Sequence, residues 1–492
     1  MENEIVTNKK IRVRFAPSPT GMMHLGNVRT ALLNYLFAKQ KNGTFVLRIE
    51  DTDPERNFDP GAVKIMEDLN WLGLTYDEGP NKPGSFPPYF QAQRTEIYQE
   101  NLQQLISENK VYRCFCSQEE LENKKQRQIA LKIAPRYDKT CCKLTPEQIK
   151  EKLDKNIPFI WRMKLDPNTK ITITDISHGQ ITFDMKNFSD FPITRQTGTF
   201  TFMFSNFVDD MVMDITHVIR GEDHLSNTAG QAALFKAFEK ELPTYWHLPM
   251  ICNIEGKKLS KRDFGFSIRD LQEAGYLPEA LCNYLSIMGG SFEQEIMTIS
   301  ELLSVLDFSK SQAKGQIKYD LNKLNWINHK WISNYDNKKL TNLCKVYIEK
   351  EFPQAKALEK NIGENKLIRI IEILKPGLTT LKDITQEIRF LFVAPETTKI
   401  EILSLSNVDQ NSFSQIIKLL EQNLSLLSAP EEFLNKIKLE SKTNNFKIKD
   451  VFSLLRIGLI GSTKGPGIGE LIDILGSKES KNRLEKLINI AK

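Results

Sequence analysis

The chain has 492 residues, of which 40% are hydrophobic and 26% charged, an ordinary globular composition with room for about three domains. No apolar run approaches the roughly 18 residues that a membrane crossing needs, and the polar first ten residues lack the apolar stretch of a secretory signal. We therefore expect a cytoplasmic protein without a membrane partner, whose seven cysteines are reduced.

The net charge of +5 is unevenly distributed. Residues 331–492 hold 25 Lys and Arg against 20 Asp and Glu, so the whole excess lies in the C-terminal third. A basic excess in one region suits a polyanion such as nucleic acid, although an ordinary solvated surface would give the same count.

Strand and helix patterns alternate over the first 330 residues. The patterns predict strands at 11–16, 44–50 and 216–220, and helices at 27–41, 62–72 and 226–239. This alternation predicts an α/β fold with a Rossmann-type, doubly wound parallel sheet, whose ligand crevice lies at the carboxyl ends of the strands. The pattern is broken at about 111–201, which indicates an insertion between two halves of the nucleotide-binding fold.

After about Trp326 the pattern becomes helical. Apolar residues recur at i, i+3, i+4 and i+7 in two sets, Leu367, Ile370, Ile371 and Leu374, and Ile448, Val451, Phe452 and Leu455. We expect an all-helical C-terminal region, divided into two bundles near 391–401.

Two segments have the composition of a phosphate site. Residues 12–27 run from a strand through a turn, which Pro17, Pro19 and Gly21 shape, into a helix whose N-terminus attracts anions. His24 in that turn is either structural or a donor to charge developing on a phosphate. The second segment, Gly256–Arg262, carries four cations around Ser260 and is either a solvated loop or a clamp on the same phosphates.

These segments resemble the two signature motifs of class I aminoacyl-tRNA synthetases, in the right order and about 230 residues apart. The resemblance implies that His24 and Lys261 stabilise the transition state in which a carboxylate attacks the α-phosphate of ATP, while Lys258 and Arg262 support the phosphates. It also implies the remaining members of the motifs and the ATP contacts, which are Gly26, Asn27, Ser260, Pro17, Thr20, Gly21, Asp223 and Leu259.

Longer matches are similar to bacterial glutamyl-tRNA synthetases. They include Ala16-Pro-Ser-Pro-Thr-Gly21, Leu47-Arg-Ile-Glu-Asp-Thr-Asp53, Val208-Asp-Asp210 and Val218-Ile-Arg-Gly-Glu-Asp223. The resemblance implies that Arg14 and Arg220 face the substrate carboxylates, that Glu50 takes the ammonium, and that Ala16, Ser18 and Asn206 line the pocket. Phe202 stands where the family commonly has a tyrosine, so it forms a wall without the hydroxyl.

The family implies an ATP-dependent, AMP-forming glutamate–tRNA ligase, a monomer that uses ATP with Mg²⁺, L-glutamate and tRNA(Glu). It implies a catalytic fold at 1–110 and 202–260, an inserted acceptor-stem domain at 111–201, a stem-contact region at 261–330 and helical anticodon-binding domains at 331–492. An inactive tRNA-binding paralogue would have no need of the two intact motifs. Glutaminyl enzymes use β-barrels in the C-terminal region, and the truncated relative that modifies a tRNA base lacks that region.

Four cysteines form a cluster in sequence. Cys114-Phe-Cys116 is followed after 24 residues by Cys141-Cys142. Two cysteines with one residue between them and a distant third sulfur suggest tetrahedral zinc, and some family members have a zinc site here. The usual fourth position holds Lys143, so Cys142 substitutes for it or the site is a metal-free vestige.

One position bears on tRNA choice. In family members that reject the glutamine anticodon, an arginine aligns with Gly377. Glycine has no side chain to read a base, so we expect a non-discriminating enzyme that also glutamylates tRNA(Gln).

Overall fold

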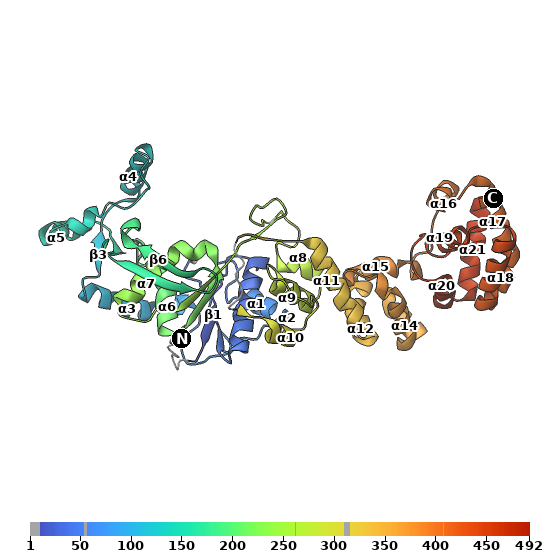
Figure 1. Cartoon of the computed structure of the whole chain (residues 1–492), viewed down its shortest axis with the longest axis horizontal. Coiled ribbons are helices and arrows are strands. Elements are labelled where there is room, and N and C mark those ends of the chain that lie inside the picture. Colours follow the sequence, from blue (N-terminus) through green and yellow to red (C-terminus); the bar gives the residue numbers. More distant parts are fainter. Residues whose placement is uncertain (1–9, 54–56, 261, 309–314, 407) are drawn as a thin grey trace. The chain divides into compact units, whose positions relative to one another are not determined.

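The computed structural model describes residues 10–53, 57–260, 262–308, 315–406 and 408–492, except the side chains of 357–359 and 361. The chain forms two compact units (Figure 1). Unit 1 comprises Met1–Leu271 and Leu281–Leu321, and unit 2 comprises Gln272–Ala280 and Asn322–Lys492. Lys261 of the expected phosphate site lies outside the described residues.

Unit 1 is built on a six-stranded sheet of order β2-β1-β7-β8-β5-β6. The strands are β1 (Arg12–Phe15), β2 (Thr44–Leu47), β5 (Lys170–Asp175), β6 (Gly179–Asp184), β7 (His217–Gly221) and β8 (Thr244–Leu248). From β2 to β5 the neighbours are parallel, and β6 is antiparallel to β5. The expected α/β class is therefore confirmed, with a mixed rather than a purely parallel sheet.

The crevice of this sheet lies between β1 and β7. The chain leaves β1, returns through α1 (Leu25–Gln40) to β2 on one side, and later places β7 on the other side of β1. Such a switch in strand order leaves a ligand crevice at the carboxyl ends of the two strands. Residues 16–24 after β1 and Arg220 near the end of β7 border this crevice.

Helices and two short ribbons complete unit 1. Helix α1 packs on β1, β2 and β7, and α6 and α7 share a buried core with the sheet. The helices are α2 (Val63–Trp71), α3 (Thr95–Ser107), α4 (Gln118–Ala130), α5 (Pro146–Asp154), α6 (Phe202–Val212), α7 (Leu225–Ala237) and α10 (Ile299–Val305). Strand β3 (Val111–Cys114) pairs with β4 (Ile160–Met163), and β9 (Ile251–Cys252) with β10 (Ile317–Lys318). Helices α8 (Ile268–Glu273) and α9 (Pro278–Ile287) contribute to both units.

Unit 2 is helical in the part of it that the structure describes. Its helices are α11 (Leu321–Asn334), α12 (Asn337–Glu351), α13 (Ala355–Ile362), α14 (Glu364–Leu374), α15 (Ile384–Glu387), α16 (Lys399–Ser406), α17 (Gln410–Asn423), α18 (Pro430–Thr443), α19 (Ile448–Ile460), α20 (Ile468–Leu475) and α21 (Ser477–Ala491). The helical prediction is confirmed, and residues 392–398 separate the last short turn before α16 from that helix. No described helix has both the length and the apolar composition that a membrane crossing requires.

The two predicted apolar stripes have different outcomes. All four residues of the stripe on α14 are buried, as expected. On α19, Val451 and Leu455 are buried and Phe452 is half-buried, but Ile448 is 44% exposed, so the stripe is buried only in part. Ile448 is the first residue of the helix, where the chain has not yet reached the packed turns.

Candidate active site

The turn after β1 ends at His24, which caps α1. The His24 Nδ1 atom accepts hydrogen bonds from the backbone N–H groups of Gly26 (3.1 Å) and Asn27 (3.3 Å). The Asn27 side chain in turn accepts from the His24 backbone N–H. A Cβ on Gly26 would lie 3.0 Å from the His24 ring, a tight contact that the ring would have to relieve by a small shift.

The cap fixes the tautomer of His24. Because Nδ1 accepts hydrogen bonds, the proton of the neutral ring is on Nε2, which is then a donor. Burial, and next the charge of Lys258, lower the pKa of His24, so the ring is neutral near pH 7. The ring stacks on Phe266, with centroids 5.2 Å apart. The two alternatives for His24 are therefore compatible: the side chain caps the helix, and its Nε2–H group is oriented as a donor.

Lys258, from the cationic segment, lies close to this turn. Lys258 is near enough to lower the pKa of His24, and its Nζ atom is 3.5 Å from Asp223, which the sequence places at the ATP site. Ser260 donates to Asp263 through both its backbone N–H and its hydroxyl, at 2.9 Å each. The two motifs are thus brought together in space, 234 residues apart in sequence for His24 and Lys258.

Behind the turn, the floor of the crevice is a buried ion network. Arg14 donates to both oxygens of Asp210, at 3.0 and 3.2 Å. Arg48 contacts Asp210 at 2.7 Å and Glu50 at 3.3 Å. Glu50 accepts from the Asn206 amide at 2.5 Å, and Asn206 accepts from Gln231 at 2.8 Å. The predicted residues Arg14, Glu50 and Asn206 therefore belong to one network.

Arg220, unlike Arg14 and Arg48, has no carboxylate partner among the described residues. It is 6% exposed, and its Nη2 atom donates to Thr228 at 2.7 Å. Its Nε and Nη1 atoms have no hydrogen-bond partner among the described residues. Burial, and then the charge of Arg14, lower the pKa of Arg220 to about 10, so it is still charged near pH 7. A buried cation with N–H groups free of protein partners is chemically suited to pair with an anion.

The remaining expected residues border the same crevice. Pro17 is buried and its carbonyl accepts from the Glu50 backbone N–H at 3.0 Å, while Ala16 is half-buried. Ser18, Thr20 and Gly21 are exposed, and Gly21 has a φ of +148°. Phe202 begins α6, with its ring centroid 5.5 Å from that of His224.

Comparisons with known proteins agree with this geometry. Residues 10–345 match the family of class I tRNA synthetases (E and Q), catalytic domain, and residues 339–488 match the anticodon binding domain. Glutamate–tRNA ligases of Finegoldia magna and Mesoplasma florum are 36% and 39% identical to the chain, over 98% of it and 99% of each relative. The chain belongs to the glutamate–tRNA ligase family. A solved glutamate–tRNA ligase from Elizabethkingia meningosepticum, in complex with its amino acid, superposes with a TM-score of 0.86 at 31% identity, covering 98% of this chain and all of that one.

The family assignment settles the activity. The ligase attaches L-glutamate to tRNA(Glu), first forming glutamyl-adenylate from glutamate and ATP and then transferring the glutamyl group to the 3′-terminal adenosine. The match covers the helical C-terminal third, which the truncated base-modifying relative lacks.

The network contains residues that the sequence did not single out. Arg48 and Asp210 pair the predicted residues, and Asp209 accepts from Arg94 at 2.7 Å and from the Tyr98 hydroxyl at 2.9 Å. Arg48, Asp209 and Asp210 lie within sequence segments that are similar to glutamyl-tRNA synthetases, so the similarity could have identified them. No local pattern indicated Thr228, because its partner Arg220 is met only through packing of α7 on β7.

The cysteine cluster is a compact group of three sulfurs and one tyrosine. The Sγ atoms of Cys114, Cys116 and Cys141 lie within 4.8 Å of one another. Among the described residues, the expected fourth ligand Cys142 lies outside this group of three sulfurs. The Tyr137 hydroxyl instead lies 3.3 Å from the Cys114 sulfur and 3.7 Å from that of Cys116.

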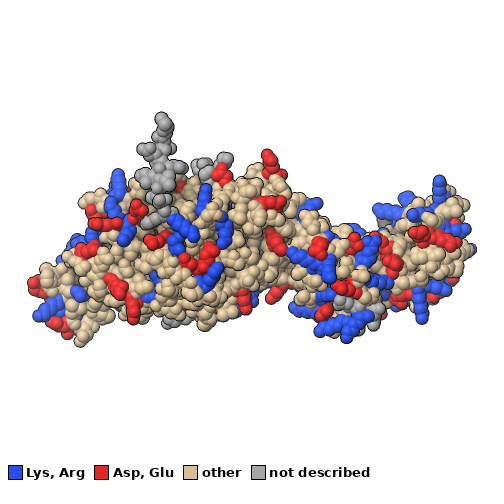
Figure 2. All heavy atoms as spheres, turned by 90° about the horizontal axis from the view of Figure 1, so that it is seen from below, with Lys and Arg blue, Asp and Glu red and all other residues tan. Residues whose placement is uncertain are grey.

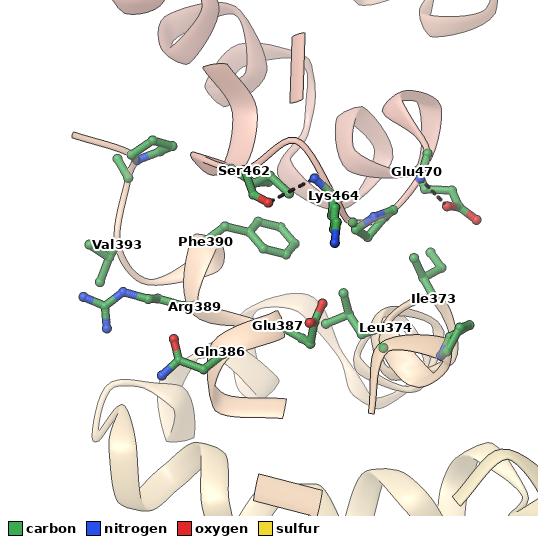
Figure 3. Close-up of a pocket in the computed structure, with 18 of the residues that line it drawn as sticks. Ile373, Leu374, Gln386, Glu387, Arg389, Phe390, Val393, Ser462, Lys464 and Glu470 are labelled. Atoms are coloured by element: carbon green, nitrogen blue, oxygen red, sulfur yellow. Dashed lines mark hydrogen bonds between the residues drawn. The ribbon is translucent and has the colours of Figure 1, made fainter. Parts of the chain in front are cut away.

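Unit 2 has a large pocket at the residue expected to govern tRNA choice (Figure 3). The cavity has a volume of about 1120 Å³, and Gly377, Glu387, Phe390 and Lys464 are among its lining residues. In Figure 3 the Glu387 and Lys464 side chains point into the same space beside the Phe390 ring. A Cβ on Gly377 would lie 3.0 Å from the Glu387 carboxyl carbon.

Proposed function

We propose that glutamate is activated in the crevice between β1 and β7, with Arg220 as the direct partner of a substrate carboxylate. The observation that carries this proposal is the buried Arg220 guanidinium, whose Nε and Nη1 atoms are unpartnered. Arg14 faces the same crevice, but Asp210 already accepts two of its N–H groups. We assign Arg14 to holding the site together beside Arg220.

Glu50 and Asn206 are the proposed partners of the substrate ammonium. Burial raises the pKa of Glu50, and the nearby charge of Arg48 opposes that shift. A substrate ammonium would bring a second positive charge to this carboxylate and so stabilise its ionised form. Ala16, Ser18 and the Phe202 ring are proposed to line the pocket around the glutamate chain.

In the first step a glutamate carboxylate oxygen forms a bond to the α-phosphorus of ATP, and the bond to pyrophosphate breaks. In the second step the terminal adenosine hydroxyl attacks the glutamyl carbonyl, and AMP leaves. We propose that the His24 Nε2–H donates to the α-phosphate as charge builds on it, with Lys258, Lys261 and Arg262 neutralising the phosphates. Mg²⁺ enters with ATP and screens its phosphates, and Pro17, Thr20, Gly21, Asp223 and Leu259 are the proposed nucleotide contacts.

Pyrophosphate exchange tests this proposal. The intact ligase should catalyse ATP–pyrophosphate exchange with glutamate, but not with glutamine or aspartate, when tRNA(Glu) is present. Arg220→Gln should raise the KM for glutamate by roughly 10- to 100-fold, as expected for a lost hydrogen bond between charged groups. An unchanged glutamate KM in Arg220→Gln would remove Arg220 from the carboxylate site.

We also propose that the cysteine cluster binds zinc, with Tyr137 as the fourth ligand. A tetrahedral ion with Zn–S bonds of about 2.3 Å places its sulfurs about 3.8 Å apart and an oxygen ligand about 3.5 Å from each sulfur. The sulfurs of Cys116 and Cys141 are 3.6 Å apart, and the Tyr137 oxygen is 3.3 Å from the Cys114 sulfur and 3.7 Å from that of Cys116. The Cys141 backbone N–H donates to the same oxygen at 3.1 Å and would stabilise it as a phenolate.

For the tRNA, we propose that residues 111–201 take the acceptor stem, 261–330 contact the stem, and 331–492 take the anticodon. On the face shown in Figure 2, Lys and Arg side chains gather over the helical unit. Gly377 supports tRNA(Gln) as a second acceptor. We further propose a monomer that works in the cytoplasm, where its seven cysteines, none of them in a disulfide, would stay reduced.

A further inference from the structure

Arg220 is the end of a chain of four buried side chains. Its Nη2 atom donates to the Thr228 hydroxyl oxygen at 2.7 Å, and that oxygen lies 2.9 Å from His247 Nε2. His247 Nδ1 lies 2.7 Å from an oxygen of Asp175. The four residues come from β7, α7, β8 and β5, and none is more than 6% exposed.

Asp175 sets the direction of every hydrogen bond in the chain. Its other oxygen accepts from the backbone N–H groups of Ser177 and His178 and from the His178 ring. Burial by itself raises the pKa of Asp175, but the hydrogen bonds from His247 and His178 outweigh it and hold the pKa at about 2. An ionised Asp175 only accepts, so His247 Nδ1 carries a proton.

The protonation of His247 determines whether Thr228 donates or accepts in the next hydrogen bond. Burial lowers the pKa of His247, so its ring is neutral and Nε2 is an acceptor. The Thr228 hydroxyl donates to Nε2, because its other acceptor, the His224 carbonyl oxygen, is farther away at 3.3 Å. A lone pair of the Thr228 oxygen is left to receive the N–H of Arg220.

This arrangement holds Arg220 without neutralising it. Arg14 is paired directly with a carboxylate, whereas the negative charge of Asp175 is separated from Arg220 by His247 and Thr228. The Tyr245 ring stacks on His247, with centroids 5.7 Å apart, and Arg220 lies 5.7 Å over the same ring. The guanidinium is thus oriented while its charge and two of its nitrogens stay available.

We propose that Thr228, His247 and Asp175 are positioning residues that set the affinity for glutamate by orienting Arg220 toward the substrate carboxylate. The proposal rests on the role of Arg220 proposed above. None of the three contacts substrate, so they act on glutamate binding and leave ATP binding alone.

The test removes the Thr228 hydroxyl group while keeping nearly the same side-chain shape. Thr228→Val should raise the KM for glutamate in pyrophosphate exchange by roughly tenfold or more, because a hydrogen bond to a charged group is lost. The KM for ATP should stay within about twofold. Thr228→Ser keeps the hydroxyl and should restore the glutamate KM to within about threefold of the unaltered ligase. The matched control is Thr341→Val. Thr341 is also a buried threonine with a hydrogen-bonded hydroxyl, but it lies in unit 2, so its loss should change neither KM.

The outcomes separate this proposal from the one on which it rests. If Arg220→Gln raises the glutamate KM while Thr228→Val does not, the positioning role is wrong and the role of Arg220 stands. If neither variant raises it, the role of Arg220 is wrong. A serine variant as impaired as the valine variant would show that packing, not the hydroxyl, matters.

A second measurement observes the His247 ring directly in the unaltered ligase and uses variants only to assign its signal. The chain has six histidines, so ¹⁵N labelling of histidine gives few ring signals, and loss of one in His247→Gln assigns it. His247 in the full-length ligase should be neutral with its proton on Nδ1. A proton on Nε2, or a doubly protonated ring, at pH 7 would overturn the proposal. If the glutamine variant does not fold, Asp175→Asn should shift the His247 and His178 ring signals together, because Asp175 contacts both rings, and loss of one signal in His178→Gln then tells the two apart.

Discussion

His24 combines two roles in one side chain, and substitution can separate them. Asparagine is a good N-cap residue but cannot reproduce the imidazole Nε2–H, so His24→Asn should keep the cap and lose the donor. We expect kcat for pyrophosphate exchange to fall roughly 10²- to 10³-fold, with thermal unfolding nearly unchanged. His24→Ala should lose as much activity and also about 1 kcal/mol of stability. An asparagine variant with full kcat would leave His24 with only the structural role.

Phe202 lacks the hydroxyl group of the tyrosine that is common in the family, and its effect on glutamate binding can be tested. Its half-exposed ring borders the crevice beside His224, where the family commonly has tyrosine. Phe202→Tyr should lower the KM for glutamate about 2- to 10-fold, the range of one hydrogen bond at a half-exposed position. Phe202→Leu, which keeps an apolar wall, is the control. An unchanged or raised KM in the tyrosine variant would contradict the prediction.

At the level of single residues, the sequence could identify candidate site residues but not the residues that they contact. His24, Glu50 and Arg220 stand in recognisable motifs, whereas Tyr137 and Thr228 became visible only in the fold. Tyr137 joins Cys114 across 23 residues, and His247 joins Asp175 across 72. Such contacts depend on how strands are ordered in the sheet, which no local periodicity records.

Among the elements, β5 has a sequence pattern from which a strand could have been predicted. Lys170–Asp175 alternates exposed and buried side chains over its whole length, the pattern of a half-buried strand, yet the segment 111–201 was interpreted only as an insertion. Its pairing with β8 through Asp175 and Tyr245 could not be foreseen, because parallel pairing joins segments far apart in the chain. This strand carries Asp175 to the site.

The ribbon of β3 and β4 and the short turn at Thr140–Lys143 should depend on a metal ion. Cys114, Phe115 and Cys141 form the buried centre of this cluster, and partly buried side chains such as Leu144 and Phe159 pack around it. Because two of the three central residues are proposed metal ligands, a bound ion would add to the stability of the cluster. We expect about one equivalent of zinc after purification without chelator. Chelation should speed amide hydrogen exchange in Val111–Cys114 and Thr140–Lys143 while leaving β1 and β7 unchanged.

A variant pair identifies the fourth ligand. Tyr137→Phe should weaken zinc binding, whereas Cys142→Ser should retain it, since Cys142 lies outside the sulfur group. Less than about a tenth of an equivalent of zinc in the unaltered ligase would refute the site. Equal zinc affinity in Tyr137→Phe would refute the tyrosine ligand alone.

For the whole molecule, the proposed sites for chemistry and for the choice of tRNA lie in different units. The proposed glutamate and ATP residues belong to unit 1, and the pocket around Gly377 belongs to unit 2. A change at Gly377 should therefore alter the efficiency with each tRNA while the KM values for glutamate and ATP stay the same.

Gly377→Arg should convert the ligase from a non-discriminating to a discriminating one. The new side chain would start 3.0 Å from the Glu387 carboxyl group, the flexible end of a side chain that is able to move and to pair with the new cation. We expect kcat/KM for tRNA(Gln) to fall roughly 10- to 100-fold relative to tRNA(Glu), the discrimination that one base contact supplies. Gly377→Ala adds only a methyl group and should leave the ratio within about threefold. Failure of the unaltered ligase to glutamylate purified tRNA(Gln) would refute non-discrimination, and an unchanged ratio in Gly377→Arg would show that other lining residues, with Glu387 and Lys464 the first to test, decide which anticodon is accepted.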